Sequence, residues 1–308
     1  MMRRRLLILG AALLWDRYFG EPPARVHPVV GVGKVIDRAM EHGIRGDRRK
    51  DQARGLLMAV GVPVAVFGMT ATAMGALGRL GSIPAIVGGA FLLKSSFAIS
   101  AMETEGRRVS AALGAGDLPG ARESLSGIVS RDVSELDESG VASAAISTIA
   151  ENVADSAVGP MLAYGIFGVP GAMAYRAINT MDTMAGYRDH RADFGRAAAK
   201  LDDAANWVPA RVAGGAVVAS AAMTGMDSRS AVRTMLREHS RTESPNGGWP
   251  IGATAGALGV EVEKVGHYRL GPEGRKATPP DIDRSLRLFA GAAAVGAVIA
   301  AGLIMARR

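Results

Sequence analysis

Two carboxylates and an amide interrupt a hydrophobic stretch of the chain. Glu151 and Asp155 are four residues apart, and Asn152 precedes Asp155 by three, so a helix would place these oxygen-bearing side chains on one face. Mg²⁺ is usually held by one or two carboxylates together with substrate phosphates. Because ionisable groups beside apolar segments are costly and usually functional, we favour a metal site here. The alternative is a water-exposed loop between two helices.

Two more polar groups have helical spacing beside hydrophobic segments. Asn179 and Asp182 are three residues apart, and a charged stretch follows at 187–193. Asp202 and Asn206 are four apart, with Asp203 between them. The first group indicates a phosphate or metal site, or else a solvated helix end. The second group is equally typical of acids at a helix N-terminus, where the helix dipole stabilises them.

A loop and a buried cation are further candidates for anion binding. Proline and glycine in Ser-Pro-Asn-Gly-Gly-Trp-Pro at 244–250 predict a tight turn whose backbone N–H groups can face an anion. An ordinary loop is the alternative. Lys94 lies near the middle of an apolar segment. It is either a phosphate ligand within the bilayer depth or a lysine that extends its ammonium to the interface.

Several common chemistries are excluded by what the sequence lacks. The chain has no cysteine, which excludes disulfides, thiolate nucleophiles and cysteine-bound zinc. It contains no G-x-x-x-x-G-K-[ST], no Rossmann G-x-G-x-x-G after a strand and no G-x-S-x-G. An ATP site here would therefore not be a P-loop. The net charge of +7 comes from bases interleaved with acids, which does not favour nucleic-acid binding.

The segments that position these residues are hydrophobic enough to cross a bilayer. Apolar residues make up 48% of the chain and are clustered, and the 40 glycines suit closely packed membrane helices. Arginines at 3–5 and 307–308 flank apolar runs and predict cytoplasmic ends. We therefore predict an all-α, polytopic integral membrane helical bundle with polar cytoplasmic helices and loops, a single domain over 1–308, in the cell (inner or plasma) membrane. The expected spans are 56–78, 83–102, 157–178, 208–224 and 286–306, with further membrane-embedded pieces at 6–19 and 141–150.

Six short segments in a fixed order resemble one known family. The chain is similar over nearly its whole length to the adenosylcobinamide-phosphate synthases, the CobD/CbiB family of cobalamin biosynthesis. Any one of the segments is weak, and together they are specific. They are DRYFGEPP at 16–23 with HPV at 27–29, SRDV at 130–133 with LD at 136–137, AENVADS at 150–156, YRAINTMD at 175–182, LDDAANWVPAR at 201–211 and SPNGGWP at 244–250.

The resemblance implies an ATP-dependent acid–amine ligase with a corrinoid substrate. Adenosylcobyric acid would be joined to (R)-1-aminopropan-2-ol or its O-phosphate, with ATP and Mg²⁺ as cofactors. By analogy with other amide ligases, an acyl phosphate would form and the amine would attack it. The implied catalytic residues are Glu151, Asp155, Asp182 and Arg176, of which the three carboxylates would also hold the metal. The implied residues for substrate and ATP binding are Lys94, Arg131, Asn152, Asn179, Asp202, Asp203, Asn206, Arg211, Ser244 and Asn246.

Two other classes of membrane protein fit parts of this pattern. An intramembrane Mg²⁺-dependent prenyltransferase would also use Asn-x-x-Asp and Asp-x-x-x-Asn pairs to bind diphosphate. A small-molecule transporter would use intramembrane polar residues as an ion path, although here these residues cluster at span ends. The expected partners are the small-molecule substrates and membrane lipid, without nucleic acid. Homo-oligomers and complexes with other membrane enzymes of the corrinoid pathway are further expectations.

Overall fold

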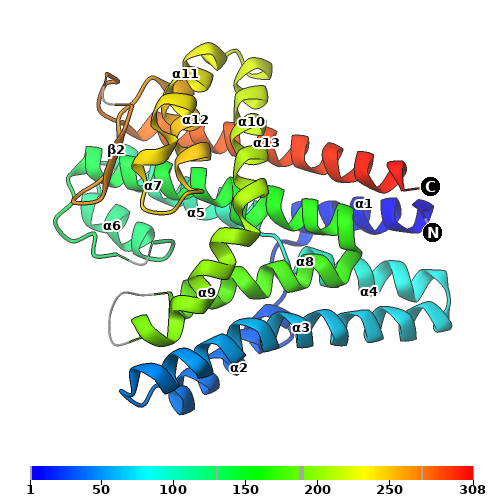
Figure 1. The fold of residues 1–308 in the computed structure, drawn as a ribbon. Helices are drawn as coiled ribbons and strands as arrows, with labels where there is room; N and C mark the ends of the chain where they lie inside the picture. The colour runs from blue at the N-terminus through cyan, green and yellow to red at the C-terminus, as the bar shows by residue number, and fades with distance from the viewer. Residues whose placement is uncertain (1, 130, 187–190, 272, 308) are drawn as a thin grey trace. The chain divides into compact units, whose positions relative to one another are not determined.

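The fold is helical almost throughout, as the sequence predicts. A computed structural model describes residues 2–129, 131–186, 191–271 and 273–307 (Figure 1). Within these ranges the only strands are two of three residues each, which confirms the all-α class. The chain divides into two compact units. Unit 1 comprises Met1–Ala98, Gly159–Asn206 and Ala297–Arg308, and unit 2 comprises Ile99–Val158 and Trp207–Gly296.

Each unit is assembled from helices distant in sequence. Unit 1 contains α1 (Met2–Phe19), α2 (Pro28–Gly43), α3 (Arg48–Leu80), α4 (Ser82–Lys94), α8 (Gly159–Ala185), α9 (Ala192–Ala205) and the end of α13 (Pro279–Ala306). Unit 2 contains α5 (Ile99–Gly114), α6 (Leu118–Ser126), α7 (Glu138–Val153), the π-helix η1 (Ala154–Val158), α10 (Trp207–Met223), α11 (Ser228–Glu238), the 3₁₀ helix η2 (His239–Arg241), α12 (Gly248–Leu258), β1 (Val262–Lys264), β2 (Tyr268–Leu270) and the first part of α13.

Four helical segments of the described chain are long and apolar enough to cross a membrane, and the chain is an all-α membrane protein. The expected spans 56–78, 83–102, 157–178 and 286–306 lie within them. The piece 208–224 corresponds to the shorter apolar helix α10, and the pieces 6–19 and 141–150 lie in α1 and α7. The four segments are Arg48–Leu80, Ser82–Gly114, Glu138–Ala185 and Pro279–Ala306.

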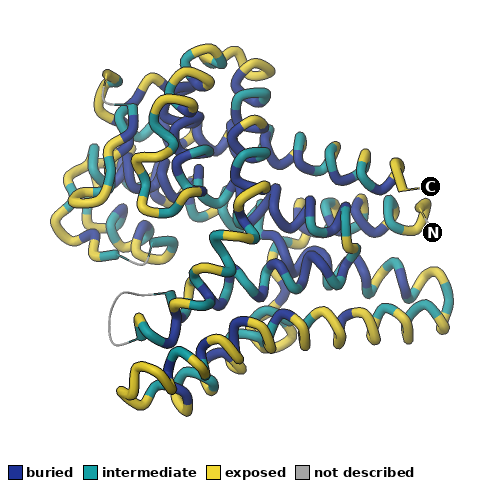
Figure 2. The backbone as a smooth tube through the Cα atoms, viewed as in Figure 1, coloured by how far each residue is buried: buried dark blue, intermediate teal, exposed yellow. Residues whose placement is uncertain are grey.

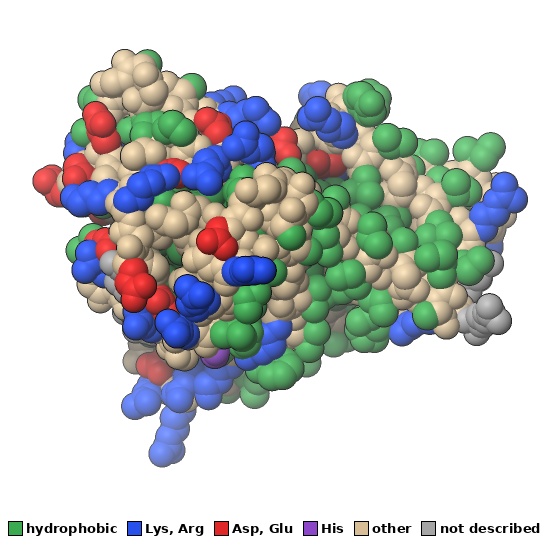
Figure 3. Space-filling model, turned by 90° about the horizontal axis from the view of Figure 1, so that it is seen from above, with side chains coloured by type: hydrophobic (Ala, Val, Ile, Leu, Met, Phe, Trp, Pro, Cys, Tyr) green, Lys and Arg blue, Asp and Glu red, His purple; other side chains and the backbone are tan. Residues whose placement is uncertain are grey.

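Helix α3 shows the exposed hydrophobic surface that a lipid environment requires. Only 22% of its most apolar window is buried inside the protein, and much of the helix is coloured as exposed in Figure 2. Leu57, Val64 and Met69 are among its exposed side chains. In Figure 3, hydrophobic side chains also gather at the right, over the part of unit 1 near the chain ends. An extended apolar surface is expensive in water, and in a bilayer it faces lipid at little cost.

Close backbone approaches fix α8 and α9 in unit 1. A Cβ atom on Gly55 of α3 would lie 1.9 Å from the backbone oxygen of Phe194, and one on Gly195 would lie 1.8 Å from the oxygen of Ala185. Phe194 and Met181 belong to the buried core formed with α2 and α3. Side chains larger than hydrogen would separate these helices. The contacts therefore set the end of α8, with its polar residues, beside α9.

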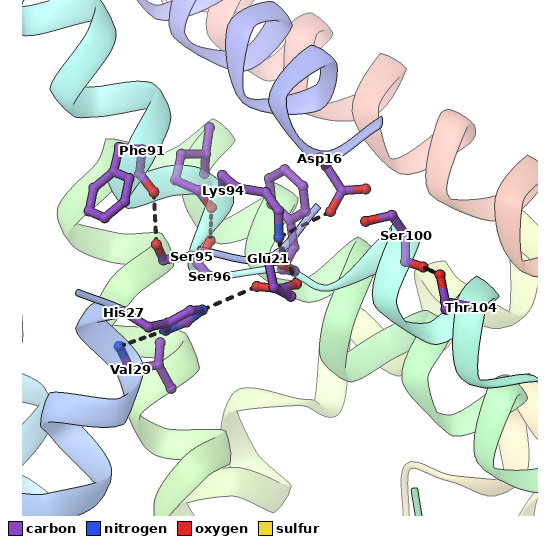
Figure 4. A network of polar contacts seen from close by, with 12 residues as sticks. Asp16, Glu21, His27, Val29, Phe91, Lys94, Ser95, Ser96, Ser100 and Thr104 are labelled. Atoms are coloured by element: carbon purple, nitrogen blue, oxygen red, sulfur yellow. Dashed lines mark hydrogen bonds and ion pairs between the residues drawn. The ribbon is translucent and has the colours of Figure 1, made fainter. Parts of the chain in front are cut away.

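A buried lysine at the end of α4 contacts the end of α1 and the segment that follows it (Figure 4). Lys94 is fully buried, and its Nζ lies 2.7 Å from Glu21 Oε1 and 3.1 Å from Asp16 Oδ1. Its ammonium also donates to the Phe97 carbonyl at 3.1 Å. Two carboxylates and a carbonyl thus surround the ammonium. Without them, a charge in this position would be prohibitively costly.

The same network continues to the start of α2. His27 Nε2 lies 3.1 Å from Glu21 Oε2, while His27 Nδ1 accepts a hydrogen bond from the Val29 N–H and caps the helix (Figure 4). Burial raises the pKa of Glu21, but the hydrogen bonds from His27 and Lys94 outweigh it and hold that pKa below its usual value. Glu21 is therefore an anion that ties α1, α2 and α4 together.

Replacing the buried lysine should destabilise unit 1. Lys94→Met removes the cation and leaves Asp16 and Glu21 as neighbouring carboxylates, which we expect to cost about 3 kcal/mol of unfolding free energy. Thermal unfolding in detergent micelles measures the loss. Lys34→Met, at an exposed lysine of α2, is the matched control. If Lys94→Met unfolds at the wild-type temperature, the network does not carry the stability assigned to it.

Candidate functional site

The ends of α8 and α9 bring acidic side chains together in unit 1. Burial, followed by the charges of Asp182 and Asp203, raises the pKa of Asp202 to about 7, against the opposing effect of a hydrogen bond from Asn206. Carboxylates that oppose each other's ionisation are typical of functional sites. The spacing of Asn179 with Asp182, and of Asp202 with Asn206, therefore corresponds to one cluster built from two helix ends. We call Asn179, Asp182, Asp202, Asp203 and Asn206 the acid–amide cluster.

Amide and phenol groups orient the acid–amide cluster. Asn206, the C-cap of α9, donates from Nδ2 to Asp202 Oδ2 at 3.0 Å and accepts a hydrogen bond from the Tyr175 hydroxyl. Asn179 also hydrogen-bonds to Asp202, and its Oδ1 accepts from Arg176 at 2.9 Å. Both asparagines are buried. Arg176 thus acts on Asp202 through Asn179.

The donor set of the acid–amide cluster fits a hard divalent cation. In the part of the chain that the structure describes, no three His, Asp or Glu side chains form a ready metal site. Mg²⁺ needs only one or two protein carboxylates when substrate phosphates and water complete its shell. The cluster offers carboxylate oxygens to such an ion, with neither histidine nor cysteine among its residues. A cation would also offset the repulsion between Asp182 and Asp202.

In unit 2, the polar residues at 151–155 span the change from α7 to a π-helix. The π-helix η1 begins directly after α7 and includes Asp155. Its wider turn interrupts the regular spacing on which the shared face of Glu151 and Asp155 was predicted, and such π-turns are frequent at functional sites. Asn152 is engaged by its own helix: Nδ2 donates to the Thr148 carbonyl at 2.9 Å, and Oδ1 accepts from Ser156 at 2.6 Å.

Glu151 meets residues from three other segments of unit 2. The charges of Lys264 and Arg131 act on its carboxylate. A Cβ atom on Gly247 would lie 3.4 Å from Glu151 Oε1. The nearby Tyr268 hydroxyl lies 2.6 Å from Ser147 Oγ. Burial and the Glu151 charge raise the pKa of Tyr268, so its hydroxyl keeps its proton.

A stacked arginine lies in the same unit. The Arg211 guanidinium carbon is 3.9 Å from the ring centroid of Trp207 and 4.8 Å from that of Trp249. His239 stacks on the other partner, Trp249, at 4.1 Å between ring centroids. Stacking and cation–π attraction hold this guanidinium in place. Within the loop 244–250, the Asn246 N–H donates to Ser244 Oγ at 3.3 Å, and Asn246 is buried.

The predicted site residues are divided between the two units. Lys94 belongs to the separate network with Asp16 and Glu21, so its part in substrate binding stays a prediction, as does a common metal site of Glu151, Asp155 and Asp182. The stretch 187–190 lies outside the described residues. Unit 1 holds Lys94, Arg176, Asn179, Asp182, Asp202, Asp203 and Asn206, and unit 2 holds Arg131, Glu151, Asn152, Asp155, Arg211, Ser244 and Asn246.

Three residues that contribute to the candidate sites were not predicted from the sequence. Tyr175 lies within a segment that was recognised, yet a tyrosine in an apolar helix carries no signal of its hydrogen bond to Asn206. Lys264 and Tyr268 lie on strands of three residues, too short for alternation to reveal. The glycine at position 266 was the available signal for a hairpin. It adopts a φ of 77° in the turn that connects the two strands.

Comparison with known proteins gives matches over most of the chain. A family model described as CobD/Cbib protein matches residues 9–289. The cobalamin biosynthesis protein CobD of Dehalococcoides mccartyi is 36% identical over 97% of each chain, and that of Geobacter metallireducens is 38% identical over 85% of this chain and 82% of its own. The probable cobalamin biosynthesis protein CobD of Methanocaldococcus jannaschii is 35% identical over 92% of each chain. No solved structure matches.

The two glycines of the 244–250 loop should respond differently to substitution. A Cβ atom at Gly248 would lie 2.0 Å from the His239 backbone oxygen, whereas at Gly247 the nearest atom is 3.4 Å away. We expect Gly248→Ala to destabilise the protein by about 1–3 kcal/mol through overpacking, and Gly247→Ala to change stability little. Thermal unfolding of the two variants checks this. Equal effects would contradict the packing of η2 against α12.

The acid–amide cluster should make stability depend on pH. The pKa of Asp202 rises from 3.8 in the unfolded chain to about 7 in the fold, so the folded state binds the extra proton. Asp202 therefore favours folding at low pH, and this contribution is lost as pH rises from near 3.8 to about 7. In magnesium-free buffer, the melting temperature of Asp202→Asn should fall less than that of wild type across this interval. Parallel curves would contradict the assignment.

Proposed function

We propose, from the premise that this chain belongs to the CobD/CbiB family, that it is a membrane-bound enzyme of cobalamin biosynthesis that forms an amide at the expense of ATP. The substrates are adenosylcobyric acid and (R)-1-aminopropan-2-ol or its O-phosphate, and the product is adenosylcobinamide or its phosphate. We place it in the cell (inner or plasma) membrane as a multi-pass protein.

The acid–amide cluster is the observation that carries this proposal. It contains carboxylates whose charges repel one another, and it contains amides that orient these carboxylates. The cluster lies at the ends of two helices of a membrane protein. Asp182 and Asp202 would hold Mg²⁺, and Asn179 and Asn206 would fix the carboxylate oxygens. When bound, the ion would neutralise charge on the phosphates of ATP. Glu151 and Asp155 are further proposed metal ligands, in unit 2.

Amide formation proceeds in two balanced steps. A propionate oxygen of the corrinoid attacks the γ-phosphorus of ATP, and ADP leaves. The amine nitrogen then attacks the acyl carbon of the resulting acyl phosphate, inorganic phosphate leaves with the former propionate oxygen, and the nitrogen loses a proton. We assign Arg131 and Arg211 to binding anionic groups in these steps. The contacts of Arg211 with the rings of Trp207 and Trp249 pre-orient its guanidinium.

The reaction can be tested directly with purified protein. Incubation with adenosylcobyric acid, ATP, Mg²⁺ and each amine should yield ADP and the matching amide in equal amounts, measured by product mass. Omission of Mg²⁺ should stop both. Consumption of a prenyl diphosphate without ATP would instead support a prenyltransferase, and corrinoid movement across vesicles without product would support a transporter. Either result would overturn the proposal.

Loss of the Asp182 carboxylate should remove the activity. Asp182→Ala and Asp182→Asn should lower kcat/KM by roughly 10²–10³-fold, because each removes a charged group that stabilises the transferring phosphate through the metal. Asp37→Asn, at an exposed acid of α2, is the control for a lost charge. Unfolding curves confirm that the variants fold. Wild-type turnover in a folded Asp182 variant would exclude Asp182 from the site.

A further inference from the structure

We infer that one end of unit 1 binds the phosphate groups of anionic phospholipids. This end carries basic side chains from three separate parts of the chain, beside exposed hydrophobic side chains. The inference goes beyond the proposed function, because it concerns the surrounding lipid and holds whether or not the protein forms an amide. We call the basic residues of this end the arginine end: Arg3, Arg4, Arg5, Arg79 and Arg307.

The last described residue of the chain is held at a break in α8. Gly168 is non-helical within α8, with a φ of 75°, and Pro170 follows it. Because proline has no N–H, the Ile166 carbonyl lacks its helical donor. Arg307, just after α13, donates a hydrogen bond to this carbonyl. The break therefore lies beside the C-terminal end of the chain (Figure 1).

A second arginine joins the first helix to the same break. Arg5 of α1 donates to the Gly165 carbonyl at 3.1 Å and also to the Tyr164 carbonyl, and the Tyr164 hydroxyl donates to the Arg5 carbonyl at 2.6 Å. One residue earlier, Arg4 Nη1 would lie 3.6 Å from a Cβ atom on Gly78 of α3. The next residue of α3 is Arg79, so the end of this helix brings a further guanidinium to the same place.

No acidic side chain of the adjoining stretches neutralises the arginine end. Arg5 and Arg307 donate to backbone carbonyls, which carry no net charge. The guanidinium groups of Arg3, Arg4 and Arg79 are exposed and form no hydrogen bond or ion pair with the described residues. Their charge therefore needs an anion from outside the chain. The stretches that contribute the arginine end and its contacts contain these five arginines and no Asp, Glu or Lys: 2–15, 72–88, 159–175 and 297–307.

The neighbouring surface favours a lipid over a dissolved anion. Leu80 and Ile83, at the α3–α4 turn, are 73% and 76% exposed, and Phe167, at the break in α8, is 63% exposed. In Figure 3, basic side chains stand among hydrophobic ones at the right. Exposed apolar side chains favour contact with acyl chains, whereas arginine forms paired hydrogen bonds to phosphate oxygens. The two features together match the headgroup region of a bilayer that contains anionic phospholipid.

The experiment removes charge without disturbing α8. Arg4 and Arg79 are replaced, because Arg5 and Arg307 also satisfy carbonyls of the break. Arg4→Gln/Arg79→Gln is compared with wild type and with Arg38→Gln/Arg49→Gln, which removes two exposed arginines from α2 and the start of α3. The melting temperature of each protein in dodecylmaltoside micelles is measured as phosphatidylglycerol is added. Parallel titrations use phosphatidylcholine and inorganic phosphate.

Phosphatidylglycerol should raise the melting temperature of wild type and of Arg38→Gln/Arg49→Gln, and phosphatidylcholine should raise it much less. Arg4→Gln/Arg79→Gln should need roughly 10- to 30-fold more phosphatidylglycerol for the same increase, because each lost guanidinium removes a contact with a lipid phosphate. Mass spectrometry of the purified proteins counts the phosphatidylglycerol molecules that each retains. This second measurement does not depend on the stability of the variants.

Three results would overturn the inference. The first is an unchanged response of Arg4→Gln/Arg79→Gln to phosphatidylglycerol, with wild-type retention of the lipid. The second is an equal loss in Arg38→Gln/Arg49→Gln, which would show an effect of net charge alone. The third is equal stabilisation of wild type by phosphatidylcholine or by inorganic phosphate, which would remove the preference for an anionic lipid. No arm of the experiment uses turnover, so an inactive wild type would contradict the proposed function and leave this test intact.

Discussion

A charge on an apolar helix has to find its counter-charge within the protein, and this constraint shapes the polar interior of the chain. Lys94 shows its simplest form: the ammonium is fully buried, and two carboxylates and a backbone carbonyl surround it. In water these groups would be solvated separately. In a bilayer-facing helix they can exist only together, so α1, α2 and α4 are held where their charges meet.

The position of the acid–amide cluster depends on how closely the helices of unit 1 approach one another. Gly55 and Gly195 admit backbone oxygens at distances that no Cβ atom would allow, and the end of α8 is thereby set beside α9. In unit 2, Gly248 allows α12 to begin against the His239 carbonyl. Small residues are thus used to place oxygen atoms, while larger hydrophobic residues on α3 face outward.

Helical spacing predicted the local groupings in this structure and failed where partners are distant in sequence. Asn179 with Asp182 and Asp202 with Asn206 were predicted because a helix fixes which residues share a face, and Asp202 and Asn206 are joined by a hydrogen bond at 3.0 Å. No such rule joins Lys94 to Glu21, which is 73 residues away. The π-helix after Glu151 was equally hidden, since a wider turn leaves no mark on hydrophobic periodicity. Whether Glu151 shares a metal with Asp182 stays a prediction.

The Lys94 network and the acid–amide cluster, both in unit 1, differ in how their charges are balanced, and this difference separates structure from function. Around Lys94, opposite charges meet and each lowers the cost of burying the other. Around Asp202, like charges meet: Asp182 and Asp203 both oppose its ionisation, and the donors that relieve it are neutral amides. An arrangement of the second kind lowers the stability of the fold above neutral pH. A fold has no structural reason to keep such a cluster, whereas a positively charged ligand gains from every carboxylate it meets there.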